Sequence, residues 1–263
     1  MISTFKKQLL KRTNTGTMPY EQQIIQELKD WQHTMLRKPS LSSKMAAAVQ
    51  GKINNIIPKK VHNAITAAVK NMVRAVLFGA THTTANPLLH KSLEAREALI
   101  DDKIETYKKT GAAEGGLTGA GGFFTSLADF PLLMGIKIKM LFDIAALYGF
   151  DVKDYRERLY MLYIFQLAFS SAEERKKVYL QIEDWENQLH QLPTDIHDFD
   201  WQTFQQQYRD YIDIAKLAQM LPFIGAAVGA IANYKLIQKL GFTAKQAYRM
   251  RFINKNIYKQ RTE

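Results

Sequence analysis

Apolar residues recur along this chain at the three- to four-residue spacing of α-helices. A first helix is predicted after Pro19, ending near Pro39, because one apolar stripe runs through it: Tyr20, Ile24, Leu28, Trp31 and Met35. The alternation of apolar and polar residues that is typical of half-buried β-strands does not extend over any long segment. The pattern therefore predicts an all-α fold, a single helical domain of roughly eight to ten helices.

Polar residues that favour helix starts divide the rest of the chain. Asp151 is expected to cap one helix, Ser171 to open a capping box for a helix over 173–191, and Thr243 to open a last, basic helix. Other helices are expected over 44–57, from 58 to about 78, over 86–109 and over 201–220. In the helix over 86–109, the residues expected to face inward are Leu88, Ser92, Ala95, Leu99 and Ile104, with charged residues such as Arg96 and Glu97 in solvent.

Two stretches combine glycine with large apolar residues. Eight of the fourteen glycines lie between Gly111 and Gly149, and a second uncharged stretch, from Leu217 to Tyr234, holds two more. Glycines four residues apart line one helix face and let another backbone approach closely. We therefore expect two glycine-rich apolar helical elements packed together through Gly115, Gly119, Gly225 and Gly229.

The first of these stretches is also long enough to span a bilayer. From Gly115 to Ile136 its 22 residues carry a single charge, on Asp129. That carboxylate and Pro131 both count against an ordinary membrane span.

These motifs carry a family resemblance. The glycine run, Asp129, the segment that ends in Tyr148-Gly149, and the later sequence PFIGAAVGAIAN over 222–233 together resemble the EcsC family of bacteria, from about Tyr20 to Arg251. That family takes its name from a gene beside a two-component ABC transporter in low-GC Gram-positive bacteria. The resemblance implies an accessory role near such a transporter or in protein secretion, and it supplies no catalytic residue. Two regions are therefore expected, an EcsC-like all-α domain over 19–263 and, before it, a basic flexible arm over 1–18, which is predicted from its own residues.

Charge is distributed unevenly along the chain. The net charge is +11, and the ends are basic while the middle is acidic: Lys and Arg outnumber Asp and Glu by 13 to 3 over 1–74 and by 10 to 3 over 201–263. Basic ends favour an anionic surface, either nucleic acid or the cytoplasmic leaflet. Because no nucleic-acid recognition motif is present, we expect an anionic membrane surface or a membrane protein such as an ABC transporter as the partner. The oligomeric state is left open.

The chain contains no cysteine, which excludes structural disulfides and thiolate metal sites. We expect a cytoplasmic protein at the cytoplasmic face of the cell membrane. The glycine run over 115–122 lacks the Lys-Ser/Thr pair of a phosphate-binding loop. The polar cluster between His190 and Asp200 is interpreted as a loop with helix caps, and we expect neither a metal nor another cofactor.

The most promising place for chemistry lies between the two glycine elements. Three acids fall within small or apolar sequence, where ionisation is unfavourable, and they can gather with Lys137, Lys139 or Asn233 into a polar site: Glu114, Asp129 and Asp143. Alternatively, Asp129 caps the helix that begins near Pro131. Two functions follow: a non-catalytic, membrane-associated helical protein, or a soluble enzyme such as a hydrolase with a carboxylate site around Asp129.

Overall fold

The computed structural model describes residues 20–37, 86–120, 130–171, 174–193, 195–198 and 226–262, together with the single residues 67, 71 and 76. Their elements are all helices: α2 (Tyr20–Leu36), α5 (Leu93–Ala120), α7 (Phe130–Tyr148), α8 (Tyr155–Phe169), α9 (Arg175–Glu183), α10 (Trp185–Leu189), the 3-10 helix η1 (Ile196–Asp198) and α13 (Ala226–Thr262). The predicted all-α class is confirmed. The predicted number of helices is not confirmed, since the described residues form seven α-helices. The arm over 1–18 and the helices expected over 44–57 and 201–220 lie outside the described residues.

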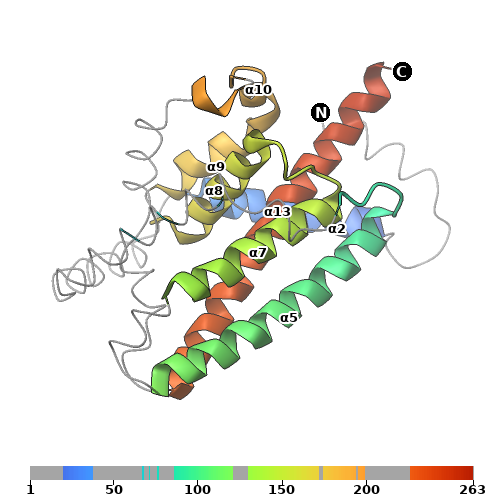
Figure 1. Cartoon of the computed structure of the whole chain (residues 1–263). Coiled ribbons are helices and arrows are strands. Elements are labelled where there is room, and N and C mark those ends of the chain that lie inside the picture. Colours follow the sequence, from blue (N-terminus) through green and yellow to red (C-terminus); the bar gives the residue numbers. More distant parts are fainter. Residues whose placement is uncertain are drawn as a thin grey trace.

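Three helices, α5, α7 and α13, run along one another over most of their length (Figure 1). α13 has 37 residues and α5 has 28, which corresponds to lengths of about 55 and 40 Å. The two helices are antiparallel, since Asp101 of α5 pairs with Lys245 of α13, whereas Lys108, further along α5, lies over the ring of the earlier Tyr234. α7 runs parallel to α13 (Figure 1).

The core lies where α2, α8 and α9 pack around the C-terminal half of α13. At its centre, Tyr248 of α13 stacks on Tyr148 of α7 with ring centroids 5.9 Å apart, and it meets Tyr160 of α8 edge-on at 5.2 Å. Trp31 of α2 meets Tyr179 of α9 edge-on at 5.6 Å. Aromatic pairs in these geometries add to the stability that their buried area supplies.

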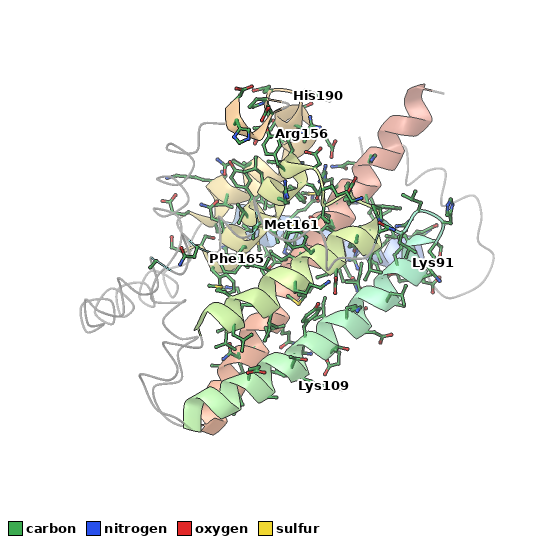
Figure 2. The ribbon with its side chains drawn as sticks, viewed as in Figure 1. Lys91, Lys109, Arg156, Met161, Phe165 and His190 are labelled. Carbon is green, nitrogen blue, oxygen red and sulfur yellow. The ribbon has the colours of Figure 1, made fainter. Side chains whose placement is uncertain are left out.

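α8 is buried on almost all sides. Met161 and Phe165 lie on the side of α8 that faces α7 (Figure 2), where they line a small void together with Ile138 and Phe142. By contrast, Lys109 projects from the outer side of α5 (Figure 2). The molecule is therefore a helical layer of α5, α7 and α13 with a compact aromatic core against one half of it.

Three predicted helix boundaries are wrong in detail. The N-cap of α8 is Asp154, whose side chain accepts a backbone N–H of the first turn, and not Asp151. The helix predicted over 173–191 is divided into α9 and α10, which meet at Asp184. Thr243 does not start a helix, because α13 continues through it and its hydroxyl donates to the carbonyl of Lys239 at 2.8 Å.

α5 differs most from its prediction. It starts and ends later than expected, and it continues through the glycines to Ala120. Its buried face holds charged residues, since Arg96 and Glu97 are buried, whereas Leu99, which was predicted to face inward, is exposed. The spacing of apolar residues did not predict that Arg96 and Glu97 are buried, because the groups that bind these charged side chains lie outside α5.

Glycine allows a close approach of α5 and α13 at two places. A Cβ atom at Gly111 would overlap Cδ1 of Ile237, and a Cβ atom at Gly241 would lie 2.9 Å from two side-chain carbons of Ile104. Gly135 of α7 differs, because nothing lies within 4 Å of the corresponding position. Both of these tight glycine contacts lie between α5 and α13.

The four glycines that were predicted to pack together lie near the end of this same helix pair. Gly115 is buried on α5, while the surroundings of Gly119, Gly225 and Gly229 lie outside the described residues and side chains. Their mutual packing stays a prediction.

The two ends of the stretch from Gly115 to Ile136 lie on different helices, α5 and α7, which pack side by side and run in opposite directions (Figure 1). Within the ranges that the structure describes, no helix combines the length and the apolar character that crossing a bilayer requires.

Substituting alanine at two helical glycines should have opposite effects on stability. Gly135→Ala should raise the free energy of unfolding by up to about 1 kcal/mol, because alanine favours the helix and the site is open. Gly241→Ala should lower it by about 1 to 2 kcal/mol, because overpacking against Ile104 outweighs that gain. Urea denaturation measures both values. Equal effects at the two positions would show that α5 and α13 are not in close contact at Gly241.

Candidate functional site: buried charges between the helices

Lys137 is the most unusual charged residue of the described structure. It lies on α7 where that helix faces α13, and it is 0% exposed. Its Nζ donates to Asn233 Oδ1 at 3.1 Å and to the carbonyl of Leu133 at 3.2 Å. Among the described residues, no carboxylate contacts it. The lysine is therefore held by two neutral acceptors in the interior.

Burial lowers the pKa of Lys137 from its ordinary value of 10.5 to about 7, because the interior disfavours the charged ammonium. A neutral amine is a base and a nucleophile, which makes such a lysine a candidate for chemistry. However, the enclosed side chain leaves a substrate no access to Nζ. The described geometry thus supplies a titrating group without a substrate site.

A second polar cluster lies between α7 and α5, around Asp143. The carboxylate of Asp143 accepts a hydrogen bond from the Tyr107 hydroxyl at 2.7 Å and pairs with Lys139 one turn earlier. Lys103 lies 3.8 Å from it. Burial and the bond to Asp143 raise the pKa of Tyr107, so Tyr107 stays a neutral hydrogen-bond donor at physiological pH.

The predicted polar site is divided between these clusters. Lys137 meets Asn233, while Asp143 meets Lys139, and Asp143 and Asn233 do not contact each other. Lys137 and Lys139 are two residues apart, which rotates them by about 200° around the helix and sends them to opposite sides. Glu114 is half-buried on α5 and joins neither cluster. Asp129 lies outside the described residues.

The most deeply buried of the described ion pairs joins Glu97 of α5 to Arg249 of α13. Both side chains are almost fully buried. The guanidinium of Arg249 donates two hydrogen bonds to the carboxylate of Glu97, and the one from Nε is 2.7 Å long. The same carboxylate accepts from the hydroxyls of Tyr20 and Tyr148 at 2.7 and 3.0 Å. Arg249 also reaches Glu27 at 2.9 Å. Four helices, α2, α5, α7 and α13, therefore meet at one ion pair.

The electrostatics of this cluster favour the charged pair. Burial opposes the charge of Arg249, but the hydrogen bonds and the charge of Glu97 outweigh it and raise the pKa of that guanidinium. Burial and the charge of Glu97 raise the pKa of Tyr148 as well. Arg249 stays charged and Tyr148 stays neutral, which suits a structural role rather than proton transfer.

Another buried charged residue, Arg251, joins α13 to α8 and α10. Its guanidinium lies 2.5 Å from Glu157 and 2.5 Å from Glu186, and its carbon is 4.3 Å from the centroid of Phe150 and 4.8 Å from that of Tyr160. Cation–π contacts of this kind stabilise a desolvated arginine.

The sequence predicted only a last, basic helix here and did not indicate that Arg249 and Arg251 are buried. One signal could have located them: both lie beside aromatic residues, Tyr248 and Phe252, in a helix without acidic residues.

The remaining candidates have local structural roles. The carboxylate of Asp195 accepts a hydrogen bond from the backbone N–H of His197 at 2.8 Å, the turn interaction expected for that polar segment.

A shallow surface depression lies between α5 and α7, and its lining contains no nucleophile paired with a base. The five lining residues are Leu99, Asp102, Lys103, Thr106 and Leu147. Within the described residues, buried charge therefore serves to join helices.

The end of the layer where α5 stops is apolar. The register that sets Asp101 opposite Lys245 also sets Ala120, the last residue of α5, opposite Ala226, the first of α13 (Figure 1). Lys137 of α7 meets Asn233 about two turns into α13. Large apolar side chains are exposed nearby, Leu132 by 53% and Ile231 by 57%. We call this region the glycine end.

The comparisons with known proteins are consistent along most of the chain. The EcsC protein family matches residues 22–253. Protein EcsC of Bacillus subtilis (strain 168) is 46% identical over 237 residues, which cover 90% of this chain and 98% of that protein. An uncharacterized protein, YdbA, of the same strain is 30% identical over 147 residues, 55% of this chain and 54% of that protein. No solved structure matches the chain.

Lys137 should make stability depend on pH in a way that Lys137→Met removes. The unfolded chain binds the proton of this lysine below about pH 10.5, and the folded protein only below about 7. The wild type is therefore destabilised as the pH falls from 10.5 to 7, by about 5 kcal/mol in total. The free energy of unfolding of Lys137→Met should rise relative to the wild type over that range. Urea denaturation of both proteins at several pH values measures the difference.

Lys139→Met is the matched control, two residues away. Its partly exposed ammonium pairs with Asp143, so its removal should cost stability and show no gain as the pH falls. A Lys137→Met effect that does not change between pH 7 and 10 would contradict a lysine held in a dry interior.

Proposed function

The chain belongs to the EcsC protein family, and from this premise we propose that it is a non-catalytic, membrane-associated helical protein. We place it at the cytoplasmic face of the cell membrane, as an accessory to an ABC transporter or to protein secretion. The observation that carries the proposal is the apolar glycine end, where large side chains that a soluble helix bundle normally buries are exposed.

The sequence that continues from the glycine end supports a membrane role. Residues 121–128, which follow α5, and 217–225, which precede α13, contain no charged side chain. Each segment includes three phenylalanine or leucine residues, Phe123, Phe124 and Leu127 in the first and Leu217, Leu221 and Phe223 in the second. Uncharged apolar sequence shortly before the exposed Leu132 and Ile231 favours contact with lipid or with a membrane protein.

Charge supports the same location. The chain has a net charge of +11, and the 37 residues of α13 include eight Lys or Arg and no acid. The cytoplasmic leaflet is anionic and attracts such segments by about 1 kcal/mol per basic residue near its surface. A peripheral protein gains stable attachment from charge and apolar contact together, and this chain offers both.

A soluble enzyme with a carboxylate site around Asp129 is the alternative. The described part of the predicted site does not support it, since Asp143 is engaged by Tyr107 and Lys139 and the amine of Lys137 is enclosed. Asp129→Asn separates the two functions, because the amide keeps the shape and removes the charge. A folded Asp129→Asn protein that fails to complement a deletion strain would favour the enzyme.

Purified protein should bind vesicles that contain phosphatidylglycerol more tightly than vesicles of phosphatidylcholine alone. Its affinity should fall as the salt concentration rises from about 50 to about 500 mM, since mobile ions screen the attraction of exposed lysines to lipid phosphates. Over that rise the Debye length shortens about threefold. Co-sedimentation measures the bound fraction. A protein that stays in the supernatant with both kinds of vesicle would contradict a membrane role.

A further inference from the structure

One face of α13 is exposed and mixes apolar with basic residues. Ile231, Lys235, Gln238 and Phe242 follow one another at intervals of four, three and four residues, which places them within a narrow arc of the helix. Ile231 is 57% and Phe242 51% exposed. The opposite side of the helix, where Asn233 meets Lys137, is buried. We call the exposed residues, together with the neighbouring exposed Lys239, the outer face of α13.

The described basic residues of α13 are placed in two ways. Three pair with acids of other helices: Lys245 with Asp101, Arg249 with Glu97 and Arg251 with Glu157. Lys235, Lys239 and Lys255 are exposed, with Nζ of Lys239 6.0 Å from the ring centroid of Phe169 and Nζ of Lys255 5.5 Å from that of Phe150. Because α13 contains no acid, the outer face carries only positive charge. This charge is complementary to an anionic surface.

We propose that the outer face of α13 is the surface that lies on the anionic leaflet, with the helix axis parallel to the membrane. This inference rests on the proposed function and names the part of the protein that meets the lipid. Ile231 and Phe242, about 16 Å apart along the helix, enter the interface, and the two lysines between them reach lipid phosphates while their stems cover apolar surface.

The composition of the outer face favours lipid over a protein groove or a second copy of the chain. A protein interface concentrates apolar residues at its centre and places charges at its rim. Here the order is reversed, since Lys235 lies between the two large apolar residues. The close contact of Gly241 with Ile104 also fixes α13 on α5, so the face is presented without the cost of folding a helix on binding.

Single cysteines provide a direct test, because the chain has none of its own. Phe242→Cys and Ile231→Cys are labelled with an environment-sensitive fluorophore, and Leu180→Cys on α9, where leucine is 44% exposed, is the matched control. On adding phosphatidylglycerol vesicles, we expect a blue shift and a severalfold rise in emission at 231 and 242 and no change at 180. Unchanged emission at 231 and 242 while the protein co-sediments with the vesicles would overturn the inference and leave the membrane role intact.

Charge reversal tests the lysines. Lys235→Glu/Lys239→Glu should weaken binding to the same vesicles at least about tenfold, whereas Lys176→Glu/Lys177→Glu on α9, which changes the net charge equally, should have a much smaller effect. Equal losses of vesicle affinity for both pairs of substitutions would show that only net charge matters, and would overturn the inference.

A blue shift of the label at position 242 that depends on protein concentration in the absence of lipid would assign the outer face of α13 to self-association instead. Wild-type protein that binds no vesicles would contradict the proposed function itself, and the inference with it.

Discussion

The buried ion pair of Glu97 and Arg249 is the interaction on which the rest of the structure depends. It joins four helices that lie far apart in the sequence, and two tyrosine hydroxyls complete the hydrogen bonds of its carboxylate. A buried pair of this kind adds little net stability compared with apolar residues, yet removing one partner leaves an uncompensated charge in the interior. The expected effect is on specificity, because a register of α13 on α5 that separated the two charges would leave each of them buried without its partner.

That register also arranges the surface. With Arg249 and Arg251 turned toward acids of α5, α8 and α10, α13 presents the exposed Lys235 on the side opposite the buried Asn233. The same alignment brings the ends of α5 and α13 together, where Leu132 and Ile231 are exposed. The inner charges thus hold the helix in place, and the outer face and the glycine end are left for a membrane or a membrane partner.

Local patterns predicted the elements better than their contacts. The apolar stripe of α2 is confirmed, with Ile24, Leu28 and Trp31 buried, because periodicity reports burial wherever the buried residues are apolar. It failed on α5, since Glu97 is buried beside a partner 152 residues away, which no local pattern contains. In the candidate site, the acids were expected to gather with Lys137, Lys139 or Asn233, and Asp143 does pair with Lys139. The sequence could not show that Lys137 and Asn233 meet on the other side of α7, where no acid among the described residues contacts Lys137.

A double-mutant cycle on Glu97 and Arg249 tests most directly whether this pair organises the helices. Urea unfolding of Glu97→Ala, Arg249→Ala and the double variant gives the coupling free energy. Each single substitution should lower the free energy of unfolding by about 3 to 5 kcal/mol, and the double substitution should cost no more than one of them, because the second change removes the stranded charge. Single costs below about 1 kcal/mol, or costs that simply add, would show that the four helices are held together without this ion pair.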